Sequence, residues 1–212
     1  MIISHRHRFI FAAVPKTGTH AVRRALREQM GAEDLEQVGL FVERKFPWPE
    51  LAAAGHGHFA LRQVRPFVGE ETFADYVKFA FVRNPFDRFV SYCAFMLRQT
   101  DHFQRSPREA MYRFAFAHPN PDHILFRPQA SLLVDDDGQS LLADAIGRVE
   151  DMQASYDAIC ARIGIASQTL ERVNASKHGD YRRYYDQRLA EAVAQRYAAD
   201  LAMFGYSFDG VR

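Results

Sequence analysis

The sequence contains little cysteine, almost no excess charge and no long apolar run. Its two cysteines, Cys93 and Cys160, lie in apolar helical patterns, so we expect buried free thiols rather than a disulfide. The 27 basic and 26 acidic residues leave a net charge of +1, which argues against nucleic acid as a partner. No stretch approaches the roughly 18 apolar residues of a membrane span, and the opening MIISHRHRFIF lacks the apolar core of a signal peptide. We therefore expect a cytoplasmic protein with no membrane span.

The chain does contain enough large apolar side chains for a sizeable core. Apolar residues make up 48% of the composition, and 18 Phe and 9 Tyr are among them. This composition is typical of globular proteins and excludes disordered and fibrous classes. A length of 212 residues favours a single domain over residues 1–212, and no linker-like segment divides the chain. The sequence favours no particular oligomeric state.

Two short apolar segments, residues 9–14 and 77–82, are each followed by a turn and a helical pattern. Apolar residues on both alternate positions are typical of central strands that are covered on both faces. The first helix is expected to begin with Thr19 as its N-cap and to end at Gly31. The second is expected to have Asn84 as its N-cap and Pro85 at its first position. Such strand-to-helix units predict an α/β fold with a parallel sheet.

Three later segments also have helical patterns, at residues 107–118, 150–163 and 186–204. Gly205 is the expected end of the last one, since glycine commonly terminates helices. The region between the two strands is less regular, and we expect Phe59 to lie in or near a further strand.

The first strand-to-helix turn, Val14-Pro-Lys-Thr-Gly-Thr-His20, has the chemistry of an anion cradle. Main-chain N–H groups at a helix N-terminus attract anions; Lys16 adds a charge, Thr17 and Thr19 add hydroxyls, and Gly18 permits close approach. A plain capped turn remains an alternative. The turn does not match the Walker pattern or G-x-G-x-x-G, which argues against a nucleoside triphosphatase and a dinucleotide fold.

The second unit offers Arg83 at the end of its strand and Ser91 in its helix. A guanidinium and a hydroxyl at this spacing are able to bind one oxyanion along the helix flank. The alternatives are a structural ion pair between Arg83 and Asp87, and a bond from Ser91 to its own helix backbone.

The two segments Pro15-Lys-Thr-Gly-Thr19 and Arg83-Asn-Pro-Phe-Asp-Arg-Phe-Val-Ser91 together resemble the signatures of sulfotransferases that use 3′-phosphoadenosine 5′-phosphosulfate (PAPS). The similarity continues at His56-Gly-His58, Phe126-Arg-Pro-Gln129, Gly147-Arg-Val-Glu150, Tyr181-Arg-Arg-Tyr-Tyr-Asp186 and Asp200-Leu-Ala-Met-Phe-Gly-Tyr206. This order is similar to the carbohydrate group that includes heparan 2-O- and chondroitin or dermatan sulfotransferases. The resemblance implies a P-loop-like three-layer sandwich, with a central parallel sheet flanked by helices, and a hydroxyl-bearing acceptor, a carbohydrate above all.

The resemblance also implies which residues bind the donor. The first signature would hold the 5′-phosphosulfate and the second the 3′-phosphate. The implied donor-binding residues are Pro15, Lys16, Thr17, Gly18, Thr19, His20, Arg83, Ser91 and Lys177. His20 departs from the family pattern, because many relatives carry a small hydroxylated residue there, and the departure bears on the acceptor more than on the donor.

Sulfuryl transfer needs a base for the acceptor hydroxyl and a cation for the leaving phosphate. Lys16 is the candidate cation, and the resemblance makes His58 the candidate base with His56 as its helper; in a strand the two rings would share one face. The alternatives for this pair are a zinc site and ordinary surface histidines, and His20 and His123 are fallback bases. The scheme requires no metal. An ATP-dependent small-molecule kinase and a non-catalytic nucleotide-binding module are the competing functions.

Overall fold

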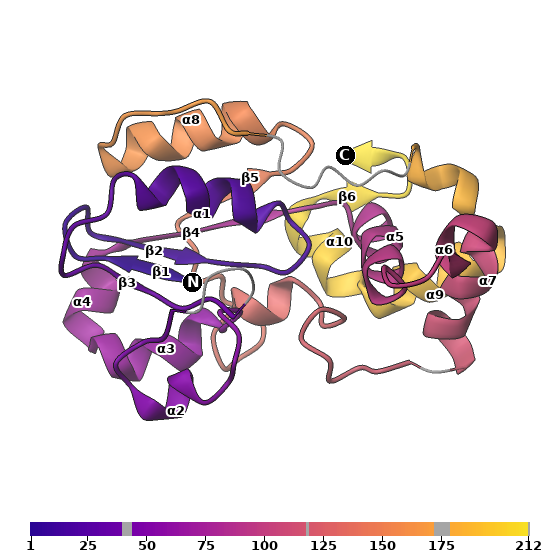
Figure 1. Ribbon diagram of the computed structural model, residues 1–212, viewed down its shortest axis with the longest axis horizontal. Coiled ribbons are helices and arrows are strands. Elements are labelled where there is room, and N and C mark those ends of the chain that lie inside the picture. The colour runs from indigo at the N-terminus through magenta and orange to yellow at the C-terminus, as the bar shows by residue number, and fades with distance from the viewer. Residues whose placement is uncertain (40–43, 118, 172–178, 212) are drawn as a thin grey trace. The chain divides into compact units, whose positions relative to one another are not determined.

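The computed structural model describes residues 1–39, 44–117, 119–171 and 179–211 (Figure 1). The chain divides into two compact units, each built from two separated segments. The first unit comprises Met1–Val82 and Ser131–Val173, and the second Arg83–Ala130 and Asn174–Arg212. In the part of the chain that is described, no helix combines the length and the apolar character needed to cross a membrane.

The first unit is built on a five-stranded sheet in the order β3-β1-β2-β4-β5. Strands β2, β4 and β5 run parallel, whereas β1 pairs antiparallel with both β2 and β3. The strands are β1 (Ile2–Ser4), β2 (Phe9–Ala12), β3 (Leu35–Glu36), β4 (Val77–Val82) and β5 (Ala145–Arg148). The predicted parallel core is confirmed, and the antiparallel edge is an addition that the sequence patterns did not indicate.

Strand β4 has the predicted bounds, and β2 ends at Ala12 instead of Val14. All of β2 and all of β4 except Val77 are buried, as expected of strands covered on both faces. Lys78 interrupts the apolar pattern of β4, and its Nζ donates to the carbonyls of Phe73 and Tyr76 and pairs with Asp144 at 2.8 Å. These partners compensate for burying the ammonium group.

Helices cover both faces of the sheet, which gives the expected three layers (Figure 1). One face is covered by α1 (Thr19–Arg27) and α8 (Met152–Ile163), which share a core with strand residues such as Phe11 and Phe81. The helices on the other side are α2 (Pro49–Ala52), α3 (Leu61–Val68) and α4 (Glu70–Asp75). The first unit is therefore an α/β sandwich, consistent with a P-loop-like fold.

Helix α1 differs from the prediction at both ends. Its N-cap is Gly18, in the left-handed region at φ 71°, and Thr19 is the first helical residue. The helix ends at Arg27, before the predicted end at Gly31. The expected N-cap role of Thr19 was wrong because glycine at position 18 takes the left-handed conformation that the tight turn needs.

The second unit is mostly helical, with α5 at its centre. Its helices and short strands are α5 (Pro85–Met96), α6 (His102–Arg105), α7 (Pro107–Tyr112), the π-helix η1 (Arg113–Ala117), the 3-10 turn η3 (Tyr181–Tyr184), α9 (Gln187–Arg196), α10 (Ala198–Phe204), β6 (Tyr206–Ser207) and β7 (Gly210–Val211). A further 3-10 turn, η2 (Ala130–Leu132), lies where the chain passes from the second unit to the first. Asn84 caps α5 as predicted, since its side chain accepts from the Phe86 N–H at 3.0 Å. The buried side of α5 packs with Leu189 and Val193 of α9.

Two helical predictions in the second unit were too long. The segment 107–118 is helical to Tyr112 and then becomes η1, and His118 lies outside the described residues. The segment 186–204 breaks at Tyr197, whose φ of −110° and ψ of 28° are not helical. The buried Tyr197 hydroxyl donates to the Phe126 carbonyl at 2.9 Å, so this residue is anchored to a distant segment. Gly205 ends α10 at φ 65°, as predicted.

Three further expectations have outcomes here. Helix α8 begins at Met152, two residues after the predicted start. Phe59 lies outside every strand, where its buried ring stacks on Phe46. Cys93 and Cys160 are free and buried, as expected, and burial raises the pKa of both thiols.

Candidate active site

The loop between β2 and α1 is a tight, largely buried turn. Lys16 and Gly18 both have positive φ, at 67° and 71°. Val14, Pro15 and Thr17 are buried, Lys16 is half-buried and Gly18 is exposed. The Thr17 hydroxyl donates to the Val14 carbonyl at 2.8 Å, so Thr17 supports the loop and offers an anion its main-chain N–H rather than its hydroxyl.

The electrostatics of this turn suit an anion. The first turn of α1 carries no acidic side chain, so the partial positive charge of the helix N-terminus is not offset there. Burial lowers the pKa of His20, and the charges of Arg23 and Lys16 lower it further. A negative charge bound to the loop would oppose the part of this shift that comes from Arg23 and Lys16.

His58 is joined to the strand end that carries the loop. Its Nδ1 lies 2.7 Å from the carbonyl oxygen of Ala13. Because a carbonyl only accepts, Nδ1 carries the proton, and in the neutral ring Nε2 keeps its lone pair. Sequence reasoning named His58 but did not reveal this contact, which joins residues 45 positions apart.

His56 and His58 are not in a strand, so the shared face that a strand would give them is not present. They lie in the irregular segment before α3, with ring centroids 6.0 Å apart. The main-chain N–H of His58 points at His56 Nδ1 at 3.3 Å, so the neutral His56 ring carries its proton on Nε2. The two rings therefore present opposite tautomers.

The pKa of His58 is strongly lowered. Burial is the main cause and brings the pKa to about 3; the hydrogen bond to Ala13 opposes this, and the charge of Arg23 adds to it. His58 is therefore neutral at physiological pH, and Nε2, which holds the lone pair, is weakly basic.

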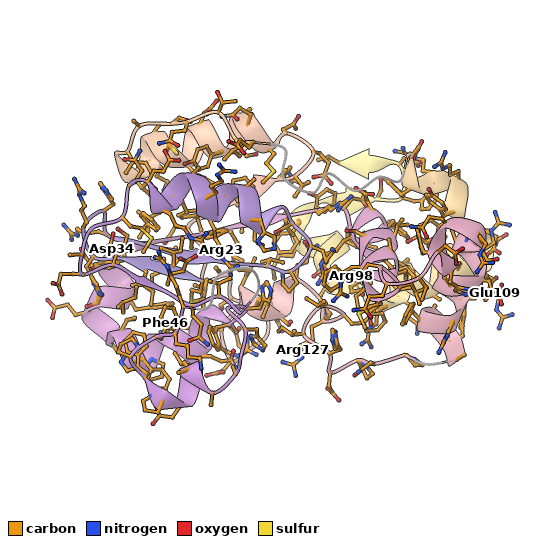
Figure 2. The ribbon with its side chains drawn as sticks, viewed as in Figure 1. Arg23, Asp34, Phe46, Arg98, Glu109 and Arg127 are labelled. Carbon is orange, nitrogen blue, oxygen red and sulfur yellow. The ribbon has the colours of Figure 1, made fainter. Side chains whose placement is uncertain are left out.

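Arg23 is a component that sequence analysis missed. This α1 residue, labelled in Figure 2, is 2% exposed. Its Nη2 donates to the carbonyl of Gly57, between the two histidines, at 3.4 Å. Its buried Nε has no hydrogen-bond partner among the described residues. Burial lowers the pKa of Arg23 to about 10, Glu36 opposing and Arg27 adding to the effect. In the sequence, Arg23 is one of three nearby arginines with Arg24 and Arg27, and nothing there indicates that it is buried.

The second candidate anion-binding site, formed by Arg83 and Ser91, belongs to the second unit. Arg83 directly follows β4, is 9% exposed, and its Nε donates to Asp87 Oδ2 at 2.7 Å. The ion pair with Asp87, one of the alternatives for Arg83, is thus present. It orients the guanidinium group, which has five N–H donors in all. Ser91 lies in α5 and is 7% exposed.

One comparison with known proteins decides the family. The family model described as "Sulfotransferase family" matches residues 1–207 of this chain. The chain belongs to the sulfotransferase family. The comparisons with curated proteins and with solved structures give no match.

The remaining predicted residues of this sulfotransferase have varied outcomes. His123 lies in the second unit beside Tyr92, with ring centroids 6.1 Å apart, and its buried Nδ1 has no hydrogen-bond partner in the described residues. Lys177 lies outside the described residues. Within the residues described, no group of three or more His, Cys, Asp or Glu side chains is arranged to hold a metal ion.

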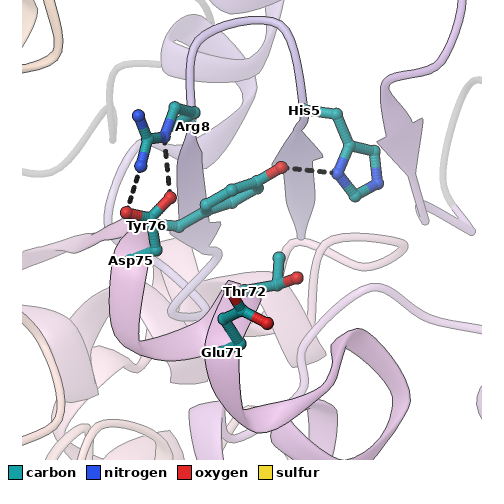
Figure 3. Close-up of a pocket in the computed structure, with 6 residues that line it drawn as sticks. All are labelled: His5, Arg8, Glu71, Thr72, Asp75 and Tyr76. Carbon is teal, nitrogen blue, oxygen red and sulfur yellow. Dashed lines mark hydrogen bonds and ion pairs between the residues drawn. The ribbon is translucent and has the colours of Figure 1, made fainter.

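A pocket of about 430 Å³ lies away from the candidate residues of the sulfotransferase (Figure 3). Its walls are His5, Arg8, Glu71, Thr72, Asp75 and Tyr76. These residues surround the β1–β2 turn, at the opposite end of β2 from the anion loop. Arg8 pairs with Asp75, and His5 bonds the Tyr76 hydroxyl at 2.8 Å, so the lining groups largely satisfy one another.

Replacing Gly57 by alanine tests the close packing of the histidine segment. A Cβ at Gly57 would lie 1.8 Å from the Gln37 carbonyl oxygen, so the main chain must move. We expect Gly57→Ala to lose about 3 kcal/mol of unfolding free energy in urea. Gly55→Ala is the matched control: its Cβ meets nothing within 4 Å, and only the strain of φ 65° remains, about 1 kcal/mol. Equal losses for both variants would contradict the packing around Gly57.

The lowered pKa of His58 makes stability depend on pH. In the unfolded chain His58 binds a proton near pH 6.5, and in the folded protein only near pH 3, so its contribution is complete above pH 6.5 and is lost as the pH falls toward 3. Between pH 7 and pH 5 we expect wild type to lose about 2 kcal/mol more than His58→Gln, measured by urea unfolding. The exposed His5→Gln should keep the wild-type dependence. Parallel curves for wild type and His58→Gln would refute a buried neutral His58.

Proposed function

We propose that this sulfotransferase moves the sulfuryl group of PAPS to a hydroxyl of a carbohydrate by in-line displacement. The observation that carries the proposal is the hydrogen bond from His58 Nδ1 to the Ala13 carbonyl. It attaches a neutral histidine, with its Nε2 lone pair, to the strand end from which the anion loop begins. A base and an anion cradle in one unit are what transfer to a hydroxyl requires.

The residues of the β2–α1 loop fit a phosphosulfate group. The loop offers main-chain N–H groups at the start of a helix whose first turn lacks acidic side chains, together with Lys16 and the nearby Arg23. We assign the 5′-phosphosulfate to residues 15–20. By the family resemblance, Arg83 and Ser91 bind the 3′-phosphate, and Lys177 is a further donor contact.

The chemistry assigns one task to each side chain. As the acceptor oxygen forms its bond to sulfur, His58 Nε2 takes the hydroxyl proton, and His56 assists by holding the segment through its bond with the His58 N–H. The bond between sulfur and the bridging phosphate oxygen breaks, and Lys16 stabilises the negative charge that develops on that oxygen. The transition state is loose, so positioning and charge stabilisation supply most of the rate.

The low pKa of His58 is compatible with this task in a charged complex. A ring with a pKa near 3 is a weak base in the free protein. A phosphosulfate bound to the neighbouring loop brings negative charge close to the ring and raises its pKa, because opposite charges favour the protonated form. The histidine thus becomes more basic when the donor is present.

Calorimetric titration with 3′-phosphoadenosine 5′-phosphate tests the donor. We expect Lys16→Ala and Arg83→Ala each to weaken binding about tenfold or more, because charge-assisted hydrogen bonds contribute about 1.5–3 kcal/mol. The exposed Lys45→Ala and Arg98→Ala are matched controls that should bind like wild type. Wild-type binding by both Lys16→Ala and Arg83→Ala would remove the assignment.

The same titration separates the competing functions. Preference for ADP, with magnesium dependence, would indicate kinase chemistry. Binding of the bisphosphate without transfer to any acceptor would indicate a non-catalytic module. A screen of sugars, lipids and phenols with radiolabelled donor identifies the acceptor class, and label on phenols or lipids alone would overturn the carbohydrate assignment.

His58→Ala should lower kcat and leave donor binding nearly unchanged. Removing a general base costs about a hundredfold or more, whereas His58 makes no donor contact in this scheme. Steady-state transfer assays measure kcat, and calorimetry measures bisphosphate affinity. His5→Ala, at the far end of β2, is the control. Unchanged turnover in His58→Ala would move the base to His56, His20 or His123.

A further inference from the structure

The main chain of Arg83 is held by a side chain 46 positions away in the sequence. The Arg83 N–H donates to Gln129 Oε1 at 2.9 Å, and Gln129 Nε2 donates to the Arg83 carbonyl at 2.9 Å. One amide group thus satisfies both main-chain groups of a single residue. At the preceding residue, the Val82 carbonyl still accepts from the Val149 N–H beyond β5. Gln129 therefore takes the place of a neighbouring strand at the position where β4 has ended.

Asp200 of α10 fixes the orientation of Gln129. Its carboxylate accepts from the Gln129 N–H at 2.9 Å, the Ala130 N–H at 2.8 Å and Gln129 Nε2 at 3.3 Å. Gln129 and Asp200 are both 0% exposed. Each Nε2 hydrogen of Gln129 then has an acceptor, and Oε1 has a donor, so only one placement of the amide satisfies every group.

Two further buried side chains hold the segment that carries Gln129. Arg88 of α5 donates to the carbonyls of Leu125 and Arg127 at 3.1 and 2.9 Å. The Tyr197 hydroxyl donates to the Phe126 carbonyl, and the Arg88 guanidinium lies 5.7 Å from the Tyr197 ring. The segment before Gln129 is therefore tied to α5 and to the break between α9 and α10.

We infer that Gln129, held by Asp200, is a positioning residue that sets the place and direction of Arg83 for the 3′-phosphate. The inference rests on the proposed function, because it gives Arg83 the role stated there. A guanidinium makes directional hydrogen bonds with an oxyanion, so a displaced main chain at residue 83 weakens that contact even though the arginine is intact. No part of the inference requires Gln129 to touch the ligand.

The test compares two ligands that differ only in the 3′-phosphate: 3′-phosphoadenosine 5′-phosphate and adenosine 5′-phosphate. Gln129→Met keeps the length of the side chain and removes all three hydrogen bonds of the amide. Calorimetry should show about tenfold weaker binding of the bisphosphate and less than about twofold change for the monophosphate, a loss of about 1.4 kcal/mol confined to one phosphate. The exposed Gln104→Met, in the same unit, is the control and should bind both ligands like wild type.

Each other outcome overturns the inference. If Gln129→Met folds and keeps the wild-type ratio of bisphosphate to monophosphate affinity, the amide of Gln129 does not position Arg83. Equal losses of affinity for both ligands show a general structural role. If Gln129→Met does not melt cooperatively, Gln129→Asn decides by the same ratio, because it keeps a neutral amide that is one methylene too short to bond both main-chain groups of Arg83. If neither variant folds, Gln129 is purely structural. A wild type that does not prefer the bisphosphate refutes the role proposed for Arg83, and the inference that depends on this role falls with it.

Discussion

The hydrogen bond between His58 and the Ala13 carbonyl is the contact on which the arrangement of the first unit's site depends. It ties the irregular segment before α3 to the end of β2, just where the anion loop begins. It also selects the tautomer, since a carbonyl accepts only from a protonated Nδ1. The bond from Arg23 to the Gly57 carbonyl holds the same segment. The contact with Ala13 helps to place the candidate base and sets its tautomer.

The positive charge of Arg23 and Lys16 is the second constraint on the site. Arg23 is buried, and together with Lys16 it lowers the pKa of His20; Arg23 also acts on His58. An anion on the loop would offset these like-charge interactions, so ligand binding and histidine protonation are thermodynamically linked. The anionic donor proposed above would suit such an environment.

The sequence predicted those parts of the structure that local signals determine. Strand β4 has the expected bounds, and α5 begins with Asn84 and Pro85 as their capping preferences indicate. The break at Tyr197 was missed, and this residue bonds Phe126, 71 residues away, a contact that no local pattern reveals. The sequence also did not reveal that the two histidines lie in an irregular segment, which contacts Ala13 and Arg23, both distant in sequence. Residue types identified the candidates, whereas long-range packing decides their geometry.

The amide of Gln129 binds residue 83 only through atoms that every amino acid except proline possesses. The anchor at this position is thus independent of the side chain that the position carries. A different residue at position 83 would keep the same main-chain position, and its side chain would offer other chemical groups to a ligand. A single substitution at position 83 would then be enough to change which ligand this position prefers, and the surrounding core would not have to change.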